Sequence, residues 1–600
     1  MIANSSTQHW VTKLTSSPWT LLLVAAVLLL SGTGTLPLID RDEPRFAQAT
    51  REMIQREDWV VPTFNGDYRF DKPILIYWMM RGTFALTGDN ELGTRLPSVI
   101  SALGLILLVY HAGKRLGSAQ TGWLAGLMLA TCLQMQLHGR MALADMPMIL
   151  AVTLANLAAF RLLFPDEGRQ KAEGTRQKAE AGSITCPSSP VPPIESIESS
   201  PPTPARCWFW LFYGSLGLGF LAKGPIAWAV PAITLLVFRF LYLRKPLPWG
   251  NLKLAWGLPI ALLIVAAWGI PALIATDGGF LKIGIGQHVV NRGLEIFNKR
   301  HYNPFFYFIT IFLSLLPYSG MIIALPWIYR KHRSRELCYL FAWITAPFIL
   351  FTPYATQLPH YTMPAFPALF LVMALALSSA VTLPPALLRI ARGFAWFVLG
   401  LAVIIAVTLL YAISQAGALT LAVPLLWAML WLSGLGLSGI LFFSRKPQWA
   451  YLGLAVMVVG FGLFASNIRG ELISLKIDAV LKEHTAIHKL IGYKFGEPSA
   501  VYYGDRRVVW TTKPEDFAAA CKAADKPYAC VLLLEERDPF KAIVNALKGQ
   551  PTAPSDPTHL LANLKGLKEF PTPDQSEITI LTGFNFGRTR LQTVAVWESR

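Results

Sequence analysis

The sequence predicts a polytopic α-helical membrane protein that ends in a small soluble α/β domain. Hydrophobic residues make up 53% of the 600 positions and charged residues only 15%, which is typical of a chain whose main solvent is lipid. Apolar runs long enough to cross ~30 Å of hydrocarbon recur along the first three quarters of the chain. These runs stop near residue 467, and the remainder is long enough for a separate soluble domain.

We expect about thirteen membrane spans from these apolar runs. They lie at 18–38, 93–111, 118–137, 143–164, 207–222, 225–243, 252–276, 305–329, 336–353, 361–381, 390–413, 418–443 and 448–466. With the N-terminus in the cytoplasm, basic clusters fall in the inward loops, as the positive-inside rule requires. These clusters are Lys114-Arg115, Arg244-Lys245, Arg330-Lys331-His332-Arg333, Arg389, Arg392 and Arg445-Lys446.

The first span has an alternative interpretation as a cleaved signal peptide, because small residues follow its apolar centre at 31–34. A charged segment is nearly absent before it, and the loop charges agree better with a retained span. A retained first span sends the loop that follows it to the outside.

The formal net charge of +17 does not indicate a nucleic-acid partner, because the basic residues are scattered through short loops instead of gathered on one soluble face. Several cations run against the inward bias, and we expect an anionic partner for them. They are Arg45, Arg51, Arg69, Lys72, Lys223, Lys282, Arg292, Lys299 and Arg300. For three basic residues of the first loop the favoured interpretation is an ordinary solvated helix face. In it Arg45, Arg51 and Arg56 pair with Glu52, Glu57 and Asp58.

The first outward loop carries the densest cluster of ionised groups beside an apolar span. Residues 43–57 are predicted to form a short amphipathic helix lying on the membrane surface, with Asp42 in the capping position. Asp42 and Glu43 are candidate catalytic carboxylates, although capping alone accounts for Asp42. In the same loop, Phe70-Asp71-Lys72-Pro73 brings a lysine near this carboxylate pair.

Two further outward turns contribute polar groups. Asp145 begins the span at 143–164, where an ionised carboxylate is costly without a partner; it could also cap that helix or pair with Arg140. Tyr361 stands at the mouth of a later span, where a tyrosine of the interfacial aromatic belt is the ordinary explanation. Each of these signals is weak by itself.

Taken in order, these motifs resemble the bacterial aminoarabinose lipid A transferases and their protein O-mannosyltransferase relatives. The resemblance covers about residues 18–380. Its motifs are Asp42-Glu43-Pro44-Arg45-Phe46-Ala47, Arg51-Glu52-Met53, Phe70-Asp71-Lys72-Pro73, Asp145-Met146-Pro147, Ala222-Lys223-Gly224-Pro225, His301-Tyr302-Asn303-Pro304-Phe305 and Leu358-Pro359-His360-Tyr361. Residues Tyr68-Arg69-Phe70-Asp71 and the spacing around Arg292 depart from the common pattern, so the same sugar and acceptor do not follow.

The resemblance implies a GT-C type glycosyltransferase fold with an extracytoplasmic active site and a polyprenyl-phosphate-linked sugar as donor. Asp42 and Asp145 match the acidic catalytic positions, and Lys72 matches a ligand of the donor phosphate. Tyr361 matches a tyrosine near the lipid phosphate, and Arg292 or His288 falls in a segment that supplies another phosphate ligand. Arg45 and Lys223 complete the set of donor-binding candidates.

The implied chemistry is transfer of the sugar to a membrane lipid, a protein or an envelope glycan. A single displacement at the anomeric carbon inverts its configuration, whereas retention needs a covalent intermediate. Asp42 would take a proton from an acceptor hydroxyl or hold the donor, and no base is needed if the acceptor is a phosphate. No cofactor is predicted; a divalent metal ion, held by Asp42 or Asp145, is left open.

A transporter or flippase of lipid-linked or anionic substrates is the alternative function. Transporter sites lie near the membrane midplane and often accompany internal repeats, whereas here the charges gather on one face and no repeat stands out. The favoured interpretation is a multi-pass enzyme of the bacterial inner membrane, with its active site and C-terminal domain outside.

We divide the chain into four parts. They are an N-terminal membrane part at 1–164 with the outward loop 39–92, a flexible cytoplasmic linker at 165–206, membrane helices at 207–466 and the C-terminal domain at 467–600. In that domain we expect a helix near 470–491, a helix at 514–524 and strands near 500–503, 507–510, 529–534 and 593–596. Whether Cys521 and Cys530 form a disulfide there is left open.

Overall fold

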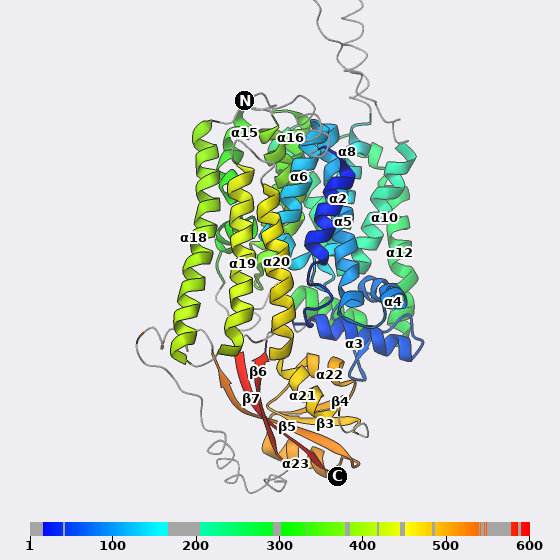
Figure 1. Cartoon of the computed structure of the whole chain (residues 1–600). Helices are drawn as coiled ribbons and strands as arrows, with labels where there is room; N and C mark the ends of the chain where they lie inside the picture. Colours follow the sequence, from blue (N-terminus) through cyan, green and yellow to red (C-terminus); the bar gives the residue numbers. More distant parts are fainter. Residues whose placement is uncertain are drawn as a thin grey trace, which may run out of the picture.

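A bundle of upright helices makes up most of the molecule, and a five-stranded sheet domain lies at one end of it (Figure 1). The computed structural model describes residues 16–39, 42–165, 205–291, 302–331, 333–378, 384–416, 419–443, 450–482, 487–538, 541, 545, 548, 578–585, 588 and 590–599. Nearly all of the predicted linker at 165–206 lies outside these residues.

Each of the thirteen predicted spans overlaps at least one helix in the described residues. The helices are α2 (Pro18–Leu30), α5 (Glu91–Leu116), α6 (Ala119–Thr131), α7 (Leu133–His138), α8 (Asp145–Leu163), α10 (Ala205–Lys223), α11 (Ile226–Val237), α12 (Leu254–Ala275), α14 (Phe306–Ser314), α15 (Leu325–Lys331), α16 (Arg335–Phe351), α17 (Phe366–Leu377), α18 (Pro385–Ala416), α19 (Leu419–Phe442) and α20 (Ala450–Ile468). Within the described residues, eight helices are long and apolar enough to cross a membrane. The count of thirteen crossings stays a prediction.

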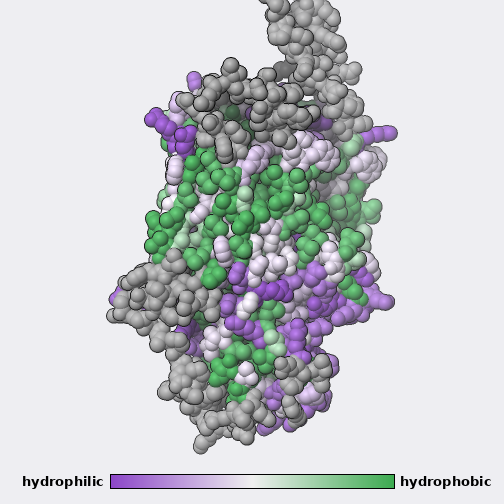
Figure 2. Space-filling view, viewed as in Figure 1, coloured by the Kyte–Doolittle hydropathy of each residue, from purple (hydrophilic) through white to green (hydrophobic). Residues whose placement is uncertain are grey.

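An apolar belt crosses the middle of the bundle on the face shown in Figure 2, with hydrophilic surface on both sides of it. Large apolar side chains are also exposed along α12, where Trp256, Leu263 and Ile274 are 70–77% exposed. Lipid is the solvent that makes such exposure favourable. The protein is therefore a multi-pass membrane protein.

The first outward loop folds against the end of the bundle. It consists of α3 (Asp42–Gln55), the short hairpin of β1 (Thr63–Phe64) and β2 (Asp67–Tyr68), and α4 (Leu75–Thr87). Helix α3 lies across the ends of the upright helices (Figure 1), close to the bounds predicted for it, with Phe46, Ala49 and Met53 buried. The predicted helix is confirmed.

The charged face of α3 is docked in part, and only some of the expected pairing is present. Arg56 does lie 3.3 Å from Asp58, but Arg51 contacts Asp89 of the α4–α5 turn and Asp505 of the C-terminal domain. The expected pairing of Arg51 with Glu52, Glu57 or Asp58 is therefore wrong. The reason is tertiary structure: the α4–α5 turn and the C-terminal domain each bring one carboxylate to Arg51, which local spacing does not reveal.

The C-terminal domain is a mixed sheet with strand order β4-β3-β5-β7-β6. Its strands are β3 (Lys489–Tyr493), β4 (Arg507–Thr511), β5 (Tyr528–Arg537), β6 (Thr579–Asn585) and β7 (Arg590–Ser599), and its helices are α21 (Ile473–Leu481), α22 (Pro498–Gly504) and α23 (Pro514–Lys522). β3 pairs in parallel with β4 and β5, and β7 pairs antiparallel with β5 and β6.

Two predictions for this domain were wrong. The expected strand at 500–503 is part of helix α22, because Pro498 begins a helical turn and Tyr502 packs against Leu38 and Ala47 of the first loop. The helix expected near 470–491 ends at Leu481, and strand β3 follows. The Sγ atoms of Cys521 and Cys530 lie 3.7 Å apart as free thiols.

Candidate active site

Asp42 begins α3 with its side chain 49% exposed, and two arginines lie at the limit of ion pairing. Its Oδ1 is 3.9 Å from the Arg45 guanidinium and 4.0 Å from that of Arg69. Such long, half-exposed contacts hold a carboxylate weakly. Asp42 therefore stays available for a substrate.

Glu43, the next residue, has the opposite environment. Its side chain is fully buried, and both oxygens accept hydrogen bonds of 2.8 Å from Arg95. The backbone N–H groups of Ala142 and Ile39 also donate to this carboxylate, at 2.8 and 3.2 Å. With its acceptor sites occupied by protein donors, Glu43 is placed to join α3, α5 and the loop before α8. This geometry favours a structural role over the predicted catalytic one.

Arg69 anchors the end of the hairpin beside Asp42. One guanidinium nitrogen lies 2.9 Å from Asp71, and Nε donates to the Tyr77 hydroxyl at 3.0 Å. Burial raises the pKa of Tyr77 to about 12, so its hydroxyl keeps its proton at neutral pH. Arg69 thereby fixes Asp71, and with it the adjacent Lys72.

A second cluster brings together residues from four helical segments: α7, α8, α10 and the short helix Pro359–Ala365. The Lys223 ammonium at the end of α10 donates to Asp145 at the start of α8, and Nε2 of His360 lies 3.7 Å from the same carboxylate. The rings of His138 and His360 are 4.5 Å apart, and Lys223 lies 5.3 Å from the centre of the Tyr361 ring. Asp145 thus pairs with Lys223 and not with Arg140, which donates to the Leu28 carbonyl and to Gln136.

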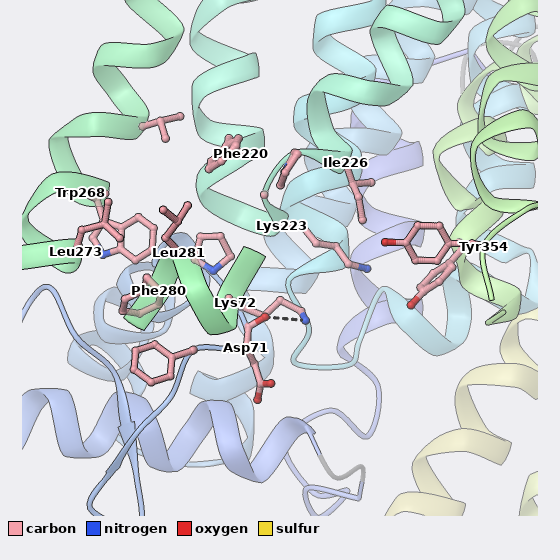
Figure 3. A pocket seen from close by; sticks show the side chains of 18 residues that line it. Asp71, Lys72, Phe220, Lys223, Ile226, Trp268, Leu273, Phe280, Leu281 and Tyr354 are labelled. Atoms are coloured by element: carbon pink, nitrogen blue, oxygen red, sulfur yellow. Dashed lines mark hydrogen bonds between the residues drawn. The ribbon is translucent and has the colours of Figure 1, made fainter. Parts of the chain in front are cut away.

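The two predicted lysines meet in one cavity of about 200 Å³, bounded by α10, α11, α12 and the helical segment Phe280–Asn291 (η3). Figure 3 shows the ammonium ends of Lys72 and Lys223 pointing into the part of this cavity that Tyr354 borders, with Trp268 and Phe280 at the other side. We call this space the lysine cavity. It combines a cationic end with apolar walls.

The remaining predicted residues lie apart or outside the described residues. Tyr361 lines the lysine cavity, whereas Arg45 lines a different cavity beside the C-terminal domain. Arg292 and the side chain of His288 lie outside the described residues. Among the described residues no group of three or more His, Cys, Asp or Glu side chains has metal-binding geometry, and the Asp145 carboxylate is taken by an ammonium.

The predicted set of site residues did not include five residues that complete these two clusters: Arg69, Asp71, His138, His360 and Tyr354. Arg69, Asp71 and His360 stand inside or next to the motifs that drew attention to Lys72 and Tyr361, and Arg69 was already expected to have an anionic partner. Their presence was visible in the sequence, but their mutual contacts depend on tertiary structure.

Several known proteins are similar to this chain. Residues 71–170 match the model of the dolichyl-phosphate-mannose-protein mannosyltransferase family. The chain is 28% identical over 464 residues to the undecaprenyl phosphate-alpha-4-amino-4-deoxy-L-arabinose arabinosyl transferase of Aeromonas salmonicida, covering 74% of this chain and 76% of that protein. The enzyme of the same name from Yersinia enterocolitica is 29% identical over 360 residues, or 59% of this chain and 57% of that protein.

The crystal structure of ArnT from Cupriavidus metallidurans in the apo state superimposes with a TM-score of 0.65, at 18% identity and with 98% of each chain covered. The chain has the GT-C fold of ArnT. The structure of the same ArnT bound to undecaprenyl phosphate matches with a TM-score of 0.64. The resemblance predicted from the sequence motifs is confirmed.

Proposed function

We propose that this protein is an integral-membrane glycosyltransferase that moves a sugar from a polyprenyl-phosphate donor to an acceptor outside the cytoplasm. The observation that carries this proposal is the lysine cavity, whose cationic end and apolar walls suit a lipid phosphate. The names of the Aeromonas and Yersinia relatives, and the undecaprenyl phosphate bound to ArnT, support the same donor class.

Lys72 and Lys223 bind the donor phosphate in this proposal. They come from the first loop and from the end of α10, so a phosphate between them is held from two sides. Preorganised cations in a site with little water stabilise the negative charge that develops on a leaving phosphate. Trp268 and Phe280 at the other side of the cavity contact the first isoprene units.

Asp145 acts on Lys223 and not directly on the sugar. Its carboxylate accepts from the Lys223 ammonium and lies near His360, which fixes where that ammonium points. Tyr361, beside the same ammonium, limits its movement on the cavity side. We therefore assign a positioning role to Asp145.

Asp42 is the residue we assign to the acceptor. An oxygen of the acceptor attacks the anomeric carbon, the bond from that carbon to the phosphate oxygen breaks, and the phosphate leaves with the bonding electrons. If the attacking group is a hydroxyl, its proton goes to Asp42, whose exposed carboxylate has no strong competing partner. One such displacement inverts the anomeric configuration.

The active site and the C-terminal domain face the periplasm in this proposal. The positive-inside distribution supports that orientation, because Lys114, Arg115 and the other basic clusters fall in the opposite set of loops. The proposed cytoplasmic linker at 165–206 then lies on the side of the membrane away from the lysine cavity.

The test is transfer by the purified chain in lipid nanodiscs, with a panel of polyprenyl-phosphate sugars and membrane acceptors. Lys72→Ala should lose donor binding and transfer. Lys114→Ala removes an exposed lysine from the last turn of α5, outside the lysine cavity, and should behave as wild type. Full transfer by Lys72→Ala would remove the lysine cavity from the mechanism. Labelling of single cysteines at positions 67 and 114 in a cysteine-free background tests the orientation, and cytosolic labelling of position 67 would contradict it.

A further inference from the structure

Two cysteines of the C-terminal domain lie in contact inside it, although they belong to different elements. Cys521 is the last residue but one of α23, and Cys530 lies near the start of β5. Their Sγ atoms are 3.7 Å apart, and the two residues are 5% and 0% exposed. The fold therefore holds two thiols against each other, away from solvent.

Helix α23 is anchored to the sheet by few side chains. It has 9 residues, which is too short for a helix to be stable alone, and it buries only Phe517 and Cys521. The Phe517 ring lies 5.8 Å from that of Tyr493 and 6.2 Å from that of Trp597. Figure 1 shows α23 at the end of the domain away from the membrane bundle. Cys521 is thus one of two side chains that hold this outlying helix in place.

The two thiols differ in reactivity. The hydrogen bond with Cys530 lowers the pKa of Cys521; burial opposes this effect, while the Tyr528 hydroxyl adds to it. The same hydrogen bond and burial raise the pKa of Cys530. Because the thiolate is the nucleophile, Cys521 reacts first and Cys530 is placed to react second. Cys521 precedes the exposed Lys522, so local opening of the last turn of α23 brings it to solvent.

Two other roles fit this pair less well. A structural zinc ion needs four ligands, and among the residues that the structure describes no group of three or more His, Cys, Asp or Glu has metal-binding geometry. Inert burial is the ordinary role of a cysteine in an apolar core, as at Cys132, whose thiol donates to the Leu129 carbonyl. Such packing does not call for a second thiol beside the first.

We propose that Cys521 and Cys530 are a site of covalent modification, at which a disulfide bond joins α23 to β5. The inference rests on the proposed orientation, because disulfides form and persist outside the cytoplasm, and it does not depend on the transfer reaction. Bonded sulfurs lie about 2.0 Å apart, and rotation of the two side chains supplies the remaining approach.

The bond forms by thiol–disulfide exchange with an external disulfide, on a protein or a small molecule. The Cys521 thiolate attacks one sulfur of that disulfide, and the other sulfur leaves as a thiolate. Cys530 then gives up its proton and attacks the Cys521 sulfur, and the second external sulfur leaves with the bonding electrons. Two electrons pass from the cysteines to the external disulfide, which becomes two thiols.

The experiment follows the two thiols in the full chain. Membranes are isolated without reductant while free thiols are blocked by alkylation, and peptides are then mapped by mass spectrometry. In parallel, purified chain in nanodiscs is reduced and then exposed to oxidised glutathione. We expect a peptide linked through Cys521 and Cys530 in both samples. The exposed Cys207 should be alkylated in the membrane sample, which shows that the reagent reached its targets.

The bond should also hold α23 in place. Hydrogen exchange of the α23 amides should be about 10-fold slower in the oxidised chain than in the reduced chain, because opening of the helix is then restricted. Cys521→Ala and Cys530→Ala should each remove the linked peptide and the effect of oxidation. Cys207→Ala, which removes the exposed thiol of α10, is the matched control and should keep both. The wild-type comparison stands even if a variant fails to fold.

The outcomes separate this inference from the proposed function. If both thiols stay free in the membrane sample while label at position 67 reports an outside location, the inference is overturned and the orientation stands. Resistance of the purified chain to oxidised glutathione, or equal exchange of α23 in its two redox states, would also overturn it. Cytosolic labelling of position 67 would defeat the proposed orientation, and the bond in the cell with it. Transfer of sugar is measured separately and does not enter this decision.

Discussion

Two buried ion pairs, Glu43–Arg95 and Asp145–Lys223, each join a carboxylate to a cation. They differ in how many hydrogen-bond donors of the cation have an acceptor in the protein. Arg95 is only 1% exposed and also donates to the carbonyls of Thr33, Leu36 and Pro37. Among the described residues Lys223 has one acceptor, Asp145, and its ammonium otherwise borders the lysine cavity. A fully satisfied pair holds the fold, whereas a partly satisfied pair can bind something else.

The difference follows from side-chain geometry. A guanidinium has five donors in a planar fork and can join several elements at once, while an ammonium is a compact charge on a flexible stem. At Arg95 the fork joins α5 to the chain before α3. At Lys223 the stem carries the charge into a cavity. The following changes test this contrast, beginning with the largest expected loss of stability.

Glu43→Ala should cause the largest loss, because it leaves the Arg95 charge buried without its carboxylate. Removing one partner of a buried pair costs about 3–5 kcal/mol of unfolding free energy. Thermal unfolding of the purified protein in detergent measures the effect. The double variant Glu43→Ala with Arg95→Met is the control and should recover part of the loss. A wild-type melting temperature for Glu43→Ala would contradict the structural role.

Acid should weaken the same pair. Burial alone raises the pKa of the Glu43 carboxyl, but Arg95 and the amides of Ala142 and Ile39 lower it more, so it lies below the ordinary 4.5. A carboxyl with a lowered pKa contributes stability that is complete above its ordinary value and is lost as the pH falls through the folded-state value. We expect melting temperature to fall below pH 4.5 less steeply in Glu43→Gln than in wild type. Equal slopes would show that another group governs the acid response.

Lys223→Gln should affect function far more than folding. The amide keeps a donor for Asp145 and the cavity can admit water, so we expect a loss of only about 1–2 kcal/mol of unfolding free energy. Loss of the cation should reduce transfer about 100-fold, because a preorganised charge on the leaving phosphate is removed. Melting and transfer assays on the same preparation separate the two effects. A loss of stability as large as that of Glu43→Ala would show that the Asp145–Lys223 pair stabilises the fold as the Glu43–Arg95 pair does.

Asp42→Asn should have the smallest effect on stability. Its contacts of 3.9 and 4.0 Å with arginines are long and half-exposed, and such pairs contribute about 0–1 kcal/mol. Transfer to a hydroxyl acceptor should fall about 100-fold, since the proposed base is gone. The rate with a phosphate acceptor should change little. Asp58→Asn, in the same loop, is the matched control for charge and should transfer normally.

The membrane body and the amphipathic helix were predictable because their signals are local. Hydropathy places the spans, and the spacing of Phe46, Ala49 and Met53 places α3. Helix α22 was missed because four apolar residues fit a strand as well as a helix turn. Pro498 at the start of α22 and the packing of α22 on α3 favour the helix over the strand.

The site was predictable only in part. Motifs singled out Asp42, Lys72, Asp145, Lys223 and Tyr361, and the structure brings the last four together around the lysine cavity or its margin. The sequence does not reveal that the adjacent carboxylates have different environments. Asp42 is half-exposed, whereas Glu43 is held by Arg95, which lies 52 positions away in the chain. Long-range partners decide such roles, and spacing along the chain does not encode them.

Phe70 and Asp71 line both the lysine cavity and the cavity beside the C-terminal domain, and this shared wall has a thermodynamic consequence. If filling one cavity shifts Phe70 and Asp71, the affinity of the other changes, and linkage requires the same factor in both directions. A lipid carrier that strengthens binding in the cavity beside the C-terminal domain must itself be held more firmly once that cavity is filled.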